Sequence, residues 1–118
     1  MKKILFSLFL VLATVSTTFA MSFSEANKQD KPVVVMFHMH GCGACKKFSP
    51  IFDSFASKFS NKFNFAKEDV DHSSIAKSLN FQTVPALYII KPKTMDAKRI
   101  DDDCAWDNAC LTKTLQDY

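Results

Sequence analysis

The chain lacks both an excess of charge of one sign and an apolar run long enough to cross a membrane. Its 15 Lys and Arg residues stand against 12 Asp and Glu, a formal net charge of +3 over 118 residues. This balance argues against a nucleic-acid partner and against strong attraction to a membrane surface, because both need an excess of positive charge. The N-terminal apolar stretch, residues 4–13, is well short of the roughly 20 residues of a spanning helix. No internal repeat or low-complexity segment occurs.

The first 20 residues have the three regions of a secretory signal peptide. Lys2 and Lys3 precede the apolar stretch, and small or polar residues lead to Ala20. No Gly or Cys motif nearby indicates lipidation. We therefore expect a signal peptide at 1–20, cleavage after Ala20, a single mature domain at 21–118, and a periplasmic or secreted protein with no membrane attachment. An uncleaved N-terminal anchor is the alternative.

All four cysteines lie in the expected mature part, at Cys42, Cys45, Cys104 and Cys110. An exported chain meets an oxidising compartment in which disulfides persist. The simplest pairing is Cys42 with Cys45 and Cys104 with Cys110, although four cysteines allow three connectivities.

The apolar pattern predicts alternating strands and helices. Residues 33–37 are continuously apolar and β-branched, which favours a central strand covered on both faces. The helix that follows runs from position 42 or 43 to about 59, and Pro50 predicts a kink in it. Its buried stripe has helical spacing and consists of Phe48, Ile51, Phe52, Phe55 and Phe59.

The remaining elements complete an α/β fold with a central mixed sheet flanked by helices. We expect a leading helix within 22–29, strands at 63–70, 84–90 and 98–101, and a short helix after Asp71 capped by Ser73 or Ser74. A last helix from about 105 to 116 is expected to bury Trp106, Ala109, Cys110 and Leu115.

The Cys42-Gly43-Ala44-Cys45 segment indicates redox chemistry. At the first turn of a helix two such sulfurs come within bonding range, and free backbone N–H groups favour the thiolate of the first. A permanent structural disulfide or half of a zinc site is the alternative. A covalent haem site is excluded, because Lys46 stands where that motif requires histidine.

The chain resembles the thioredoxin superfamily over roughly residues 31–91. The apolar strand, the paired cysteines, Lys46 and Pro50 are similar to its active-site segment. Phe65-Ala66-Lys67 resembles its next strand, and Val84-Pro85 resembles its cis-proline loop. The resemblance implies a thioredoxin-like fold and thiol:disulfide oxidoreductase activity.

By that resemblance, Cys42 is the attacking sulfur and Cys45 the shielded resolving thiol. Val84 and Pro85 would bind an extended substrate segment. The implied partners are protein thiols or disulfides and a redox partner that recharges the pair; we expect no cofactor and a monomer. The direction of electron flow stays open, because it depends on the reduction potential.

The sequence departs from the family pattern close to the cysteines. Met36 replaces a buried aspartate, Gly41 replaces the usual tryptophan, and Gly43-Ala44 is not the usual intervening dipeptide. These changes argue against the role of a cytosolic general reductase. They leave disulfide exchange itself possible, since it needs a thiolate, a leaving thiol and access.

Several other residues have two readings. His38 and His40 either tune the thiolate or form, with Cys42 and Cys45, a copper or zinc site in a metal-binding protein.

Lys67 and Glu68 either end a solvated strand, or one of them, Lys67 or Glu68, assists proton transfer to Cys45. Cys104 and Cys110 form a structural bridge, a second redox relay or a metal clip. Besides an oxidoreductase and a metal-binding protein, the third possible function is a non-catalytic interaction domain in which the Cys42–Cys45 bridge is permanent.

Overall fold

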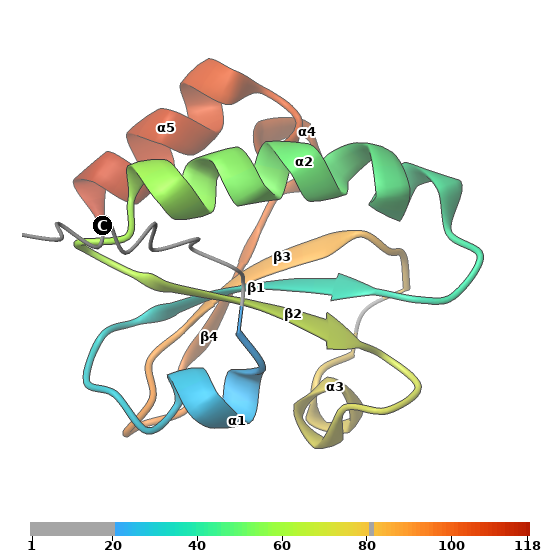
Figure 1. The fold of residues 1–118 in the computed structure, drawn as a ribbon, viewed down its shortest axis with the longest axis horizontal. Coiled ribbons are helices and arrows are strands. Elements are labelled where there is room, and N and C mark those ends of the chain that lie inside the picture. The colour runs from blue at the N-terminus through green and yellow to red at the C-terminus, as the bar shows by residue number, and fades with distance from the viewer. Residues whose placement is uncertain (1–20, 81) are drawn as a thin grey trace, which may run out of the picture.

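The computed structural model describes residues 21–80 and 82–118, so the expected signal peptide lies outside the described residues. Helices and strands alternate along this part of the chain as far as the third strand, after which another strand and two helices follow (Figure 1). Within the described part, the elements are α1 (Phe23–Ala26), β1 (Val33–His38), α2 (Gly43–Lys58), β2 (Asn64–Asp69), α3 (Ser74–Ser78), β3 (Ala86–Ile90), β4 (Ala97–Ile100), α4 (Asp102–Ala105) and α5 (Asn108–Asp117). None of the helices in these residues is long and apolar enough to cross a membrane.

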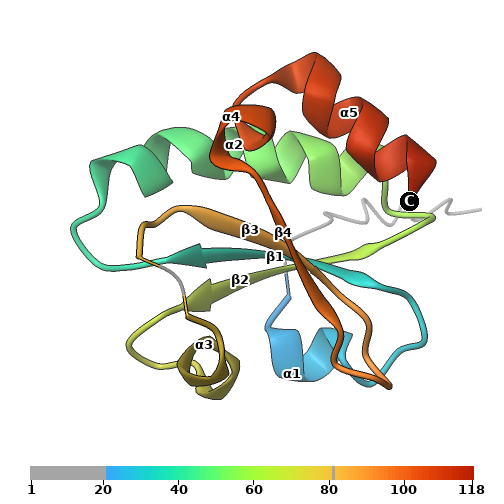
Figure 2. The ribbon, with the colours of Figure 1, turned by 180° about the vertical axis from the view of Figure 1, so that it is seen from behind.

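The strands form one mixed sheet in the order β2-β1-β3-β4 (Figure 2). β1 pairs in parallel with β2, and α2 is the crossover that a parallel pair needs. β3 runs antiparallel to both β1 and β4. The predicted fold class, an α/β fold with a central mixed sheet between helices, is confirmed.

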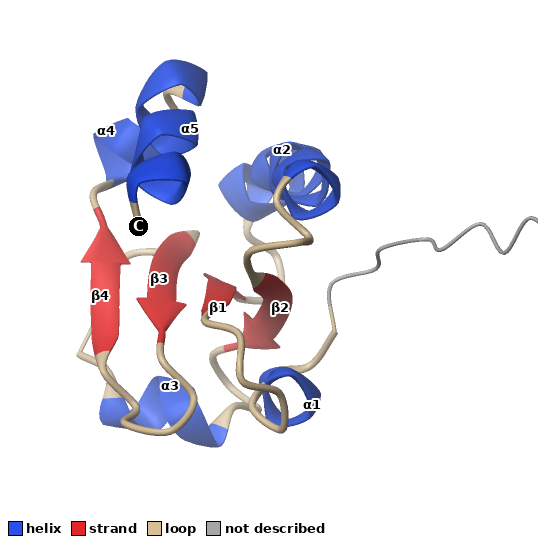
Figure 3. Cartoon of the chain, turned by 90° about the vertical axis from the view of Figure 1, so that its left-hand side faces the viewer, coloured by secondary structure: helices blue, strands red, loops and turns tan. Residues whose placement is uncertain are grey.

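Helices cover both faces of the sheet, with α2, α4 and α5 on one side and α1 and α3 on the other (Figure 3). Successive side chains of β1 point to opposite faces. Val34 and Met36 therefore join the core under α2, while Val33, Val35 and Phe37 join the core over α1 and α3. All five are buried, so β1 is the doubly covered central strand that its apolar run predicts.

The helical stripe of α2 packs as its spacing predicts. Phe48, Phe52 and Phe55 are buried, and the partly buried Ile51 and Phe59 pack against the same core. α2 continues through Pro50. Because burial of large aromatic side chains is the main stabilising contribution of such a helix, this stripe fixes α2 on the sheet.

The helix expected from about 105 to 116 is present from Asn108 as α5, but its expected start is wrong. α4 ends at Ala105 and α5 starts at Asn108, because Asp107 begins a new helix: its Oδ1 accepts from the N–H groups of Ala109 and Cys110 at 3.0 and 3.1 Å. Because the helices are separate, most of the side chains expected to be buried are exposed instead. Leu115 is buried as predicted, whereas Trp106, Ala109 and Cys110 are exposed, and Leu111 and Ala105 take the buried positions.

Candidate functional site

The two cysteines of the motif lie at the start of α2. Cys42 is the N-cap residue, and its Sγ accepts a hydrogen bond of 3.1 Å from the backbone N–H of Cys45. A disulfide joins the two residues, whose Cα atoms are 5.2 Å apart. Gly41, with φ of 79°, makes the turn from β1 into this helix in a conformation that side chains disfavour. The hydrogen bond from the N–H of Cys45 and the free N–H groups of the first turn favour negative charge on the sulfur of Cys42.

The two sulfurs differ in access to solvent. Cys42 is partly buried, whereas Cys45 is only 5% exposed and belongs to the core under α2. A large reagent therefore reaches Cys42 first. Cys45 is placed to react with the sulfur of Cys42 inside the site, rather than with a reagent that arrives from solvent.

A second segment, the proline loop (residues 83–85), faces Cys42 from the start of β3. The Val84-Pro85 peptide bond is cis. The carbonyl oxygen of Val84 lies 3.9 Å from the Sγ of Cys42, and both Val84 and Pro85 are partly buried. The structure thus brings Val84 and Pro85 together with Cys42, across 42 positions of the chain.

A cavity of about 280 Å³ opens beside the disulfide. Its lining combines the two sulfurs with imidazole, thioether and charged side chains, so both predicted histidines border the site. The lining residues are Met36, His38, Met39, His40, Gly41, Cys42, Cys45, Lys46, Ser49, Lys67 and Asp69.

The two charged candidates on β2 point to opposite faces of the sheet. Lys67 borders the cavity and is held by α2: its Nζ donates to the Oγ of Ser49 at 2.6 Å and pairs with the Oδ1 of Asp53 at 2.8 Å. Glu68 instead accepts a hydrogen bond of 2.8 Å from the N–H of Phe23 at the start of α1.

Of the two candidates for assisting Cys45, Lys67 or Glu68, the structure therefore leaves only Lys67 on the side of the cysteines. Alternation along β2 places consecutive side chains on different faces, so only one of the two could reach α2.

The described residues do not bring together a metal site. No group of three or more His, Cys, Asp or Glu side chains that could hold a metal ion occurs in residues 21–80 and 82–118. His38 and His40 border the cavity, but the sulfurs that would complete the set with them are bonded to each other. The metal-binding alternative gains no support from this arrangement.

The second disulfide joins Cys104 of α4 to Cys110 of α5, with Cα atoms 5.1 Å apart. The break between the helices makes this pairing possible, since residues six apart on one continuous helix face different directions. Cys104 packs against the core under α2, whereas Cys110 is exposed. Carboxylates border the bridge, from Asp101, Asp102, Asp103 and Asp107.

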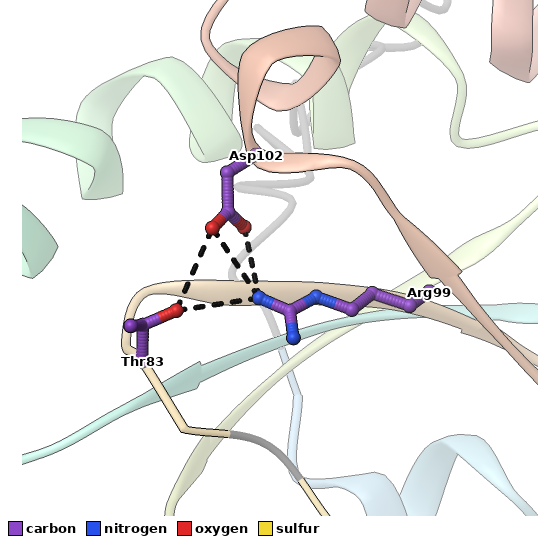
Figure 4. A network of polar contacts seen from close by, with 3 residues as sticks. All are labelled: Thr83, Arg99 and Asp102. Carbon is purple, nitrogen blue, oxygen red and sulfur yellow. Dashed lines mark hydrogen bonds and ion pairs between the residues drawn. The ribbon is translucent and has the colours of Figure 1, made fainter.

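A polar network behind the proline loop could not be predicted from the sequence. The Nη2 of Arg99 on β4 donates to the Oγ1 of Thr83 at 3.3 Å and to both carboxylate oxygens of Asp102, at 3.1 and 3.3 Å (Figure 4). Thr83 Oγ1 also donates to Asp102 Oδ2 at 3.5 Å. No local pattern marks these residues, because Thr83 is 16 and 19 positions away from its two partners.

Paired thiols at a helix start, one reachable and one shielded, opposite a cis-proline loop, define a dithiol redox protein. The Thioredoxin family model matches residues 12–116. The chain belongs to the thioredoxin family, and with Cys42 and Cys45 it is a thioredoxin-type thiol:disulfide oxidoreductase.

Relatives and solved structures agree with this assignment. A thioredoxin of Coprinus comatus is 32% identical over 96 residues, which cover 80% of this chain and 87% of the relative. A thioredoxin of Borreliella burgdorferi is 35% identical over 69 residues, 54% of this chain, but the match spans only 59% of that protein.

Two solved structures share the fold. The first thioredoxin domain of mouse protein disulfide-isomerase A4 has a TM-score of 0.67 at 20% identity, covering 80% of this chain and 68% of that one. The J-Trx1 fragment of ERdj5 has a TM-score of 0.66 at 19% identity, covering 80% of this chain and 45% of that one. At these identities the likeness concerns the fold alone.

Proposed function

We propose that this protein is exported and exchanges disulfides with protein substrates through Cys42. In the reducing direction, the Cys42 thiolate attacks a substrate disulfide and forms a mixed disulfide, which releases one substrate thiolate. The Cys45 thiolate then attacks the Cys42 sulfur, releases the second substrate thiolate and closes the Cys42–Cys45 bond. Two electrons pass to the substrate, and the oxidising direction is the reverse sequence.

One observation carries this proposal: the reachable sulfur of Cys42 lies at the start of α2 and faces the backbone of Val84. An extended segment that pairs with that backbone would present its own sulfur to Cys42. Pairing through main-chain hydrogen bonds is tolerant of side chains, which suits an enzyme that acts on many proteins.

Trapping tests the assigned roles of the two sulfurs. The Cys45→Ser variant should accumulate a mixed disulfide with a protein substrate such as insulin, because the resolving thiol is missing. The Cys42→Ser variant should trap little, since Cys45 is shielded. Equal trapping by both variants would contradict the roles, and absence of trapping together with resistance of the bridge to dithiothreitol would favour a non-catalytic interaction domain.

The direction of electron flow follows from the potential of the Cys42–Cys45 couple in glutathione buffers. A reduction potential of about −270 mV indicates a reductant, and one of about −120 mV indicates an oxidant. The Cys104→Ser/Cys110→Ser variant is the matched control, because it leaves a single redox couple. The result also states which kind of recharging partner is needed, an electron donor for a reductant or an electron acceptor for an oxidant.

Export is supported by the signal-peptide pattern of residues 1–20. Mass spectrometry of the full-length chain expressed in a bacterium, after separation of periplasm and cytoplasm, tests it. A periplasmic product that begins at Met21 is the expected result. A cytoplasmic product that retains Lys2 and Lys3 would refute export.

A further inference from the structure

The network of Thr83, Arg99 and Asp102 ties the proline loop to the end of β4 and the start of α4 (Figure 4). None of the three side chains touches a sulfur of the Cys42–Cys45 pair in any described hydrogen bond. Thr83 is, however, the immediate neighbour of Val84, whose carbonyl oxygen lies 3.9 Å from Cys42. A change in the network therefore acts on the loop backbone opposite the reactive sulfur.

Both anchors of the network are themselves fixed. Arg99 lies in β4 and pairs in register with Tyr88 of β3, so its backbone belongs to the sheet. Asp102 opens α4, and the disulfide between Cys104 and Cys110 fastens that short helix to α5. Thr83, by contrast, lies in a loop outside any helix or strand. The anchors can thus impose a position on the loop.

We propose that Thr83, Arg99 and Asp102 are positioning residues that hold the proline loop in the conformation in which it pairs with substrate. This inference rests on the proposed function, because it deepens the substrate-binding role of Val84 and Pro85. The physical effect is preorganisation: a loop that is already ordered loses less conformational entropy when a substrate segment binds. The network therefore raises affinity for an extended protein substrate and leaves the exchange chemistry unchanged.

The size of the effect follows from the exposure of the pair. The side chains of Arg99 and Asp102 are 34% and 49% exposed, so solvent weakens their attraction. Exposed ion pairs of this kind contribute only a small free energy. For substrate binding, that free energy corresponds to a change of about two- to fivefold in the equilibrium constant.

Asp103 provides a matched control. It lies beside Asp102 in the first turn of α4 and, like Asp102, borders the Cys104–Cys110 bridge, but it is outside the network. Asp102→Asn and Asp103→Asn remove the same charge from the same helix end, so both lose a similar interaction with the helix dipole. Only Asp102→Asn weakens the contacts to Arg99 and Thr83.

The test compares KM and kcat for insulin reduction in Thr83→Val, Asp102→Asn, the corresponding double variant and Asp103→Asn. We expect KM to rise about two- to fivefold in both network variants, with kcat and the rate of Cys42 alkylation by iodoacetamide, across pH, unchanged. The double variant should be little worse than either single variant, because the residues act as one unit. Thr83→Ser, which keeps the hydroxyl, should retain the KM of the unaltered protein.

An equal rise of KM in Asp103→Asn, a fall in alkylation rate that parallels the rise in KM, or full additivity in the double variant would overturn the inference. Insulin turnover by the unaltered protein with unchanged KM in the network variants would overturn this inference alone. Absence of insulin turnover by the unaltered protein, together with absence of a mixed disulfide between insulin and the Cys45→Ser variant, would overturn the proposed function and this inference with it.

Discussion

The two disulfides of this chain are the same chemical bond in different surroundings. Cys42 and Cys45 share one helix start, with one sulfur in the core and the other facing the proline loop. Cys104 and Cys110 join two separate helices, and aspartate side chains border their bridge.

Thiol exchange needs an incoming thiolate, and negative charge around a bridge repels it. Free amides at a helix start have the opposite effect, because they stabilise the negative charge on a sulfur that attacks or leaves as a thiolate. The comparison teaches that position and local charge, rather than the presence of a disulfide, separate a reactive pair from a structural one.

The largest expected effect separates the two pairs by activity. Cys42→Ser should reduce insulin turnover to the uncatalysed rate, because no other reachable sulfur stands opposite the proline loop among the described residues. A turbidity assay with dithiothreitol measures it. Gly43→Ala is the matched control within the motif, since an added Cβ at Gly43 meets no atom within 4 Å. Residual turnover by Cys42→Ser would mean that Cys45 or the second pair also reacts with substrate.

The next prediction separates the two pairs by stability. Cys104→Ser/Cys110→Ser should lower the free energy of unfolding by about 2 kcal/mol, because the bridge closes a short loop in the unfolded chain. Equilibrium unfolding in urea under non-reducing conditions measures this change. We expect kcat for insulin to be retained. A loss of kcat in this variant would place the second disulfide in the electron path.

A smaller effect is expected at the helix break that makes the second bridge possible. Asp107→Ala should cost about 1 kcal/mol of unfolding free energy, because the N–H groups of Ala109 and Cys110 lose their acceptor. Asp107→Asn keeps a good N-cap and should be close to neutral. Equal losses in the two variants would indicate that the charge, rather than the cap, stabilises α5.

The smallest effect concerns the ion pair beside the first disulfide. Lys67→Met should lower the unfolding free energy by less than about 1 kcal/mol, because Lys67 and Asp53 are partly exposed and solvent screens them. Lys93→Met is the control: Lys93 pairs with Asp30 at a site where both side chains are more than four-fifths exposed. A much larger loss of unfolding free energy for Lys67→Met would show that the hydrogen bond from Lys67 to Ser49 also stabilises the fold.

The sequence predicted features that depend on local periodicity. The β-branched run of β1 and the phenylalanine stripe of α2 each report burial directly, because side chains alternate in a strand and recur every three or four residues in a helix. The motif at Cys42 and Cys45 could be placed at a helix start for the same reason.

The helix start at Asp107 has a local signal, because an aspartate can accept from the N–H groups two and three residues further on, and the expectation of one helix over 105–116 does not use it. The burial expected for Trp106 and Cys110 is wrong for that reason.

The other differences depend on tertiary contacts. The face of Glu68 could not be assigned without the register of β2. The network of Arg99 and Asp102 with the proline loop joins distant segments, and it has no local signal at all.

Met21, the first described residue, pairs with Ala66 along the outer side of β2. Its N–H donates to the carbonyl of Phe65 at 3.0 Å, and its own carbonyl accepts from the N–H of Lys67 at 3.3 Å. Unpaired outer strands attract other chains and promote aggregation. A chain that lacked Met21 would leave the backbone groups of Phe65 and Lys67 on this side of β2 without their partner, which would favour pairing with a strand of another chain.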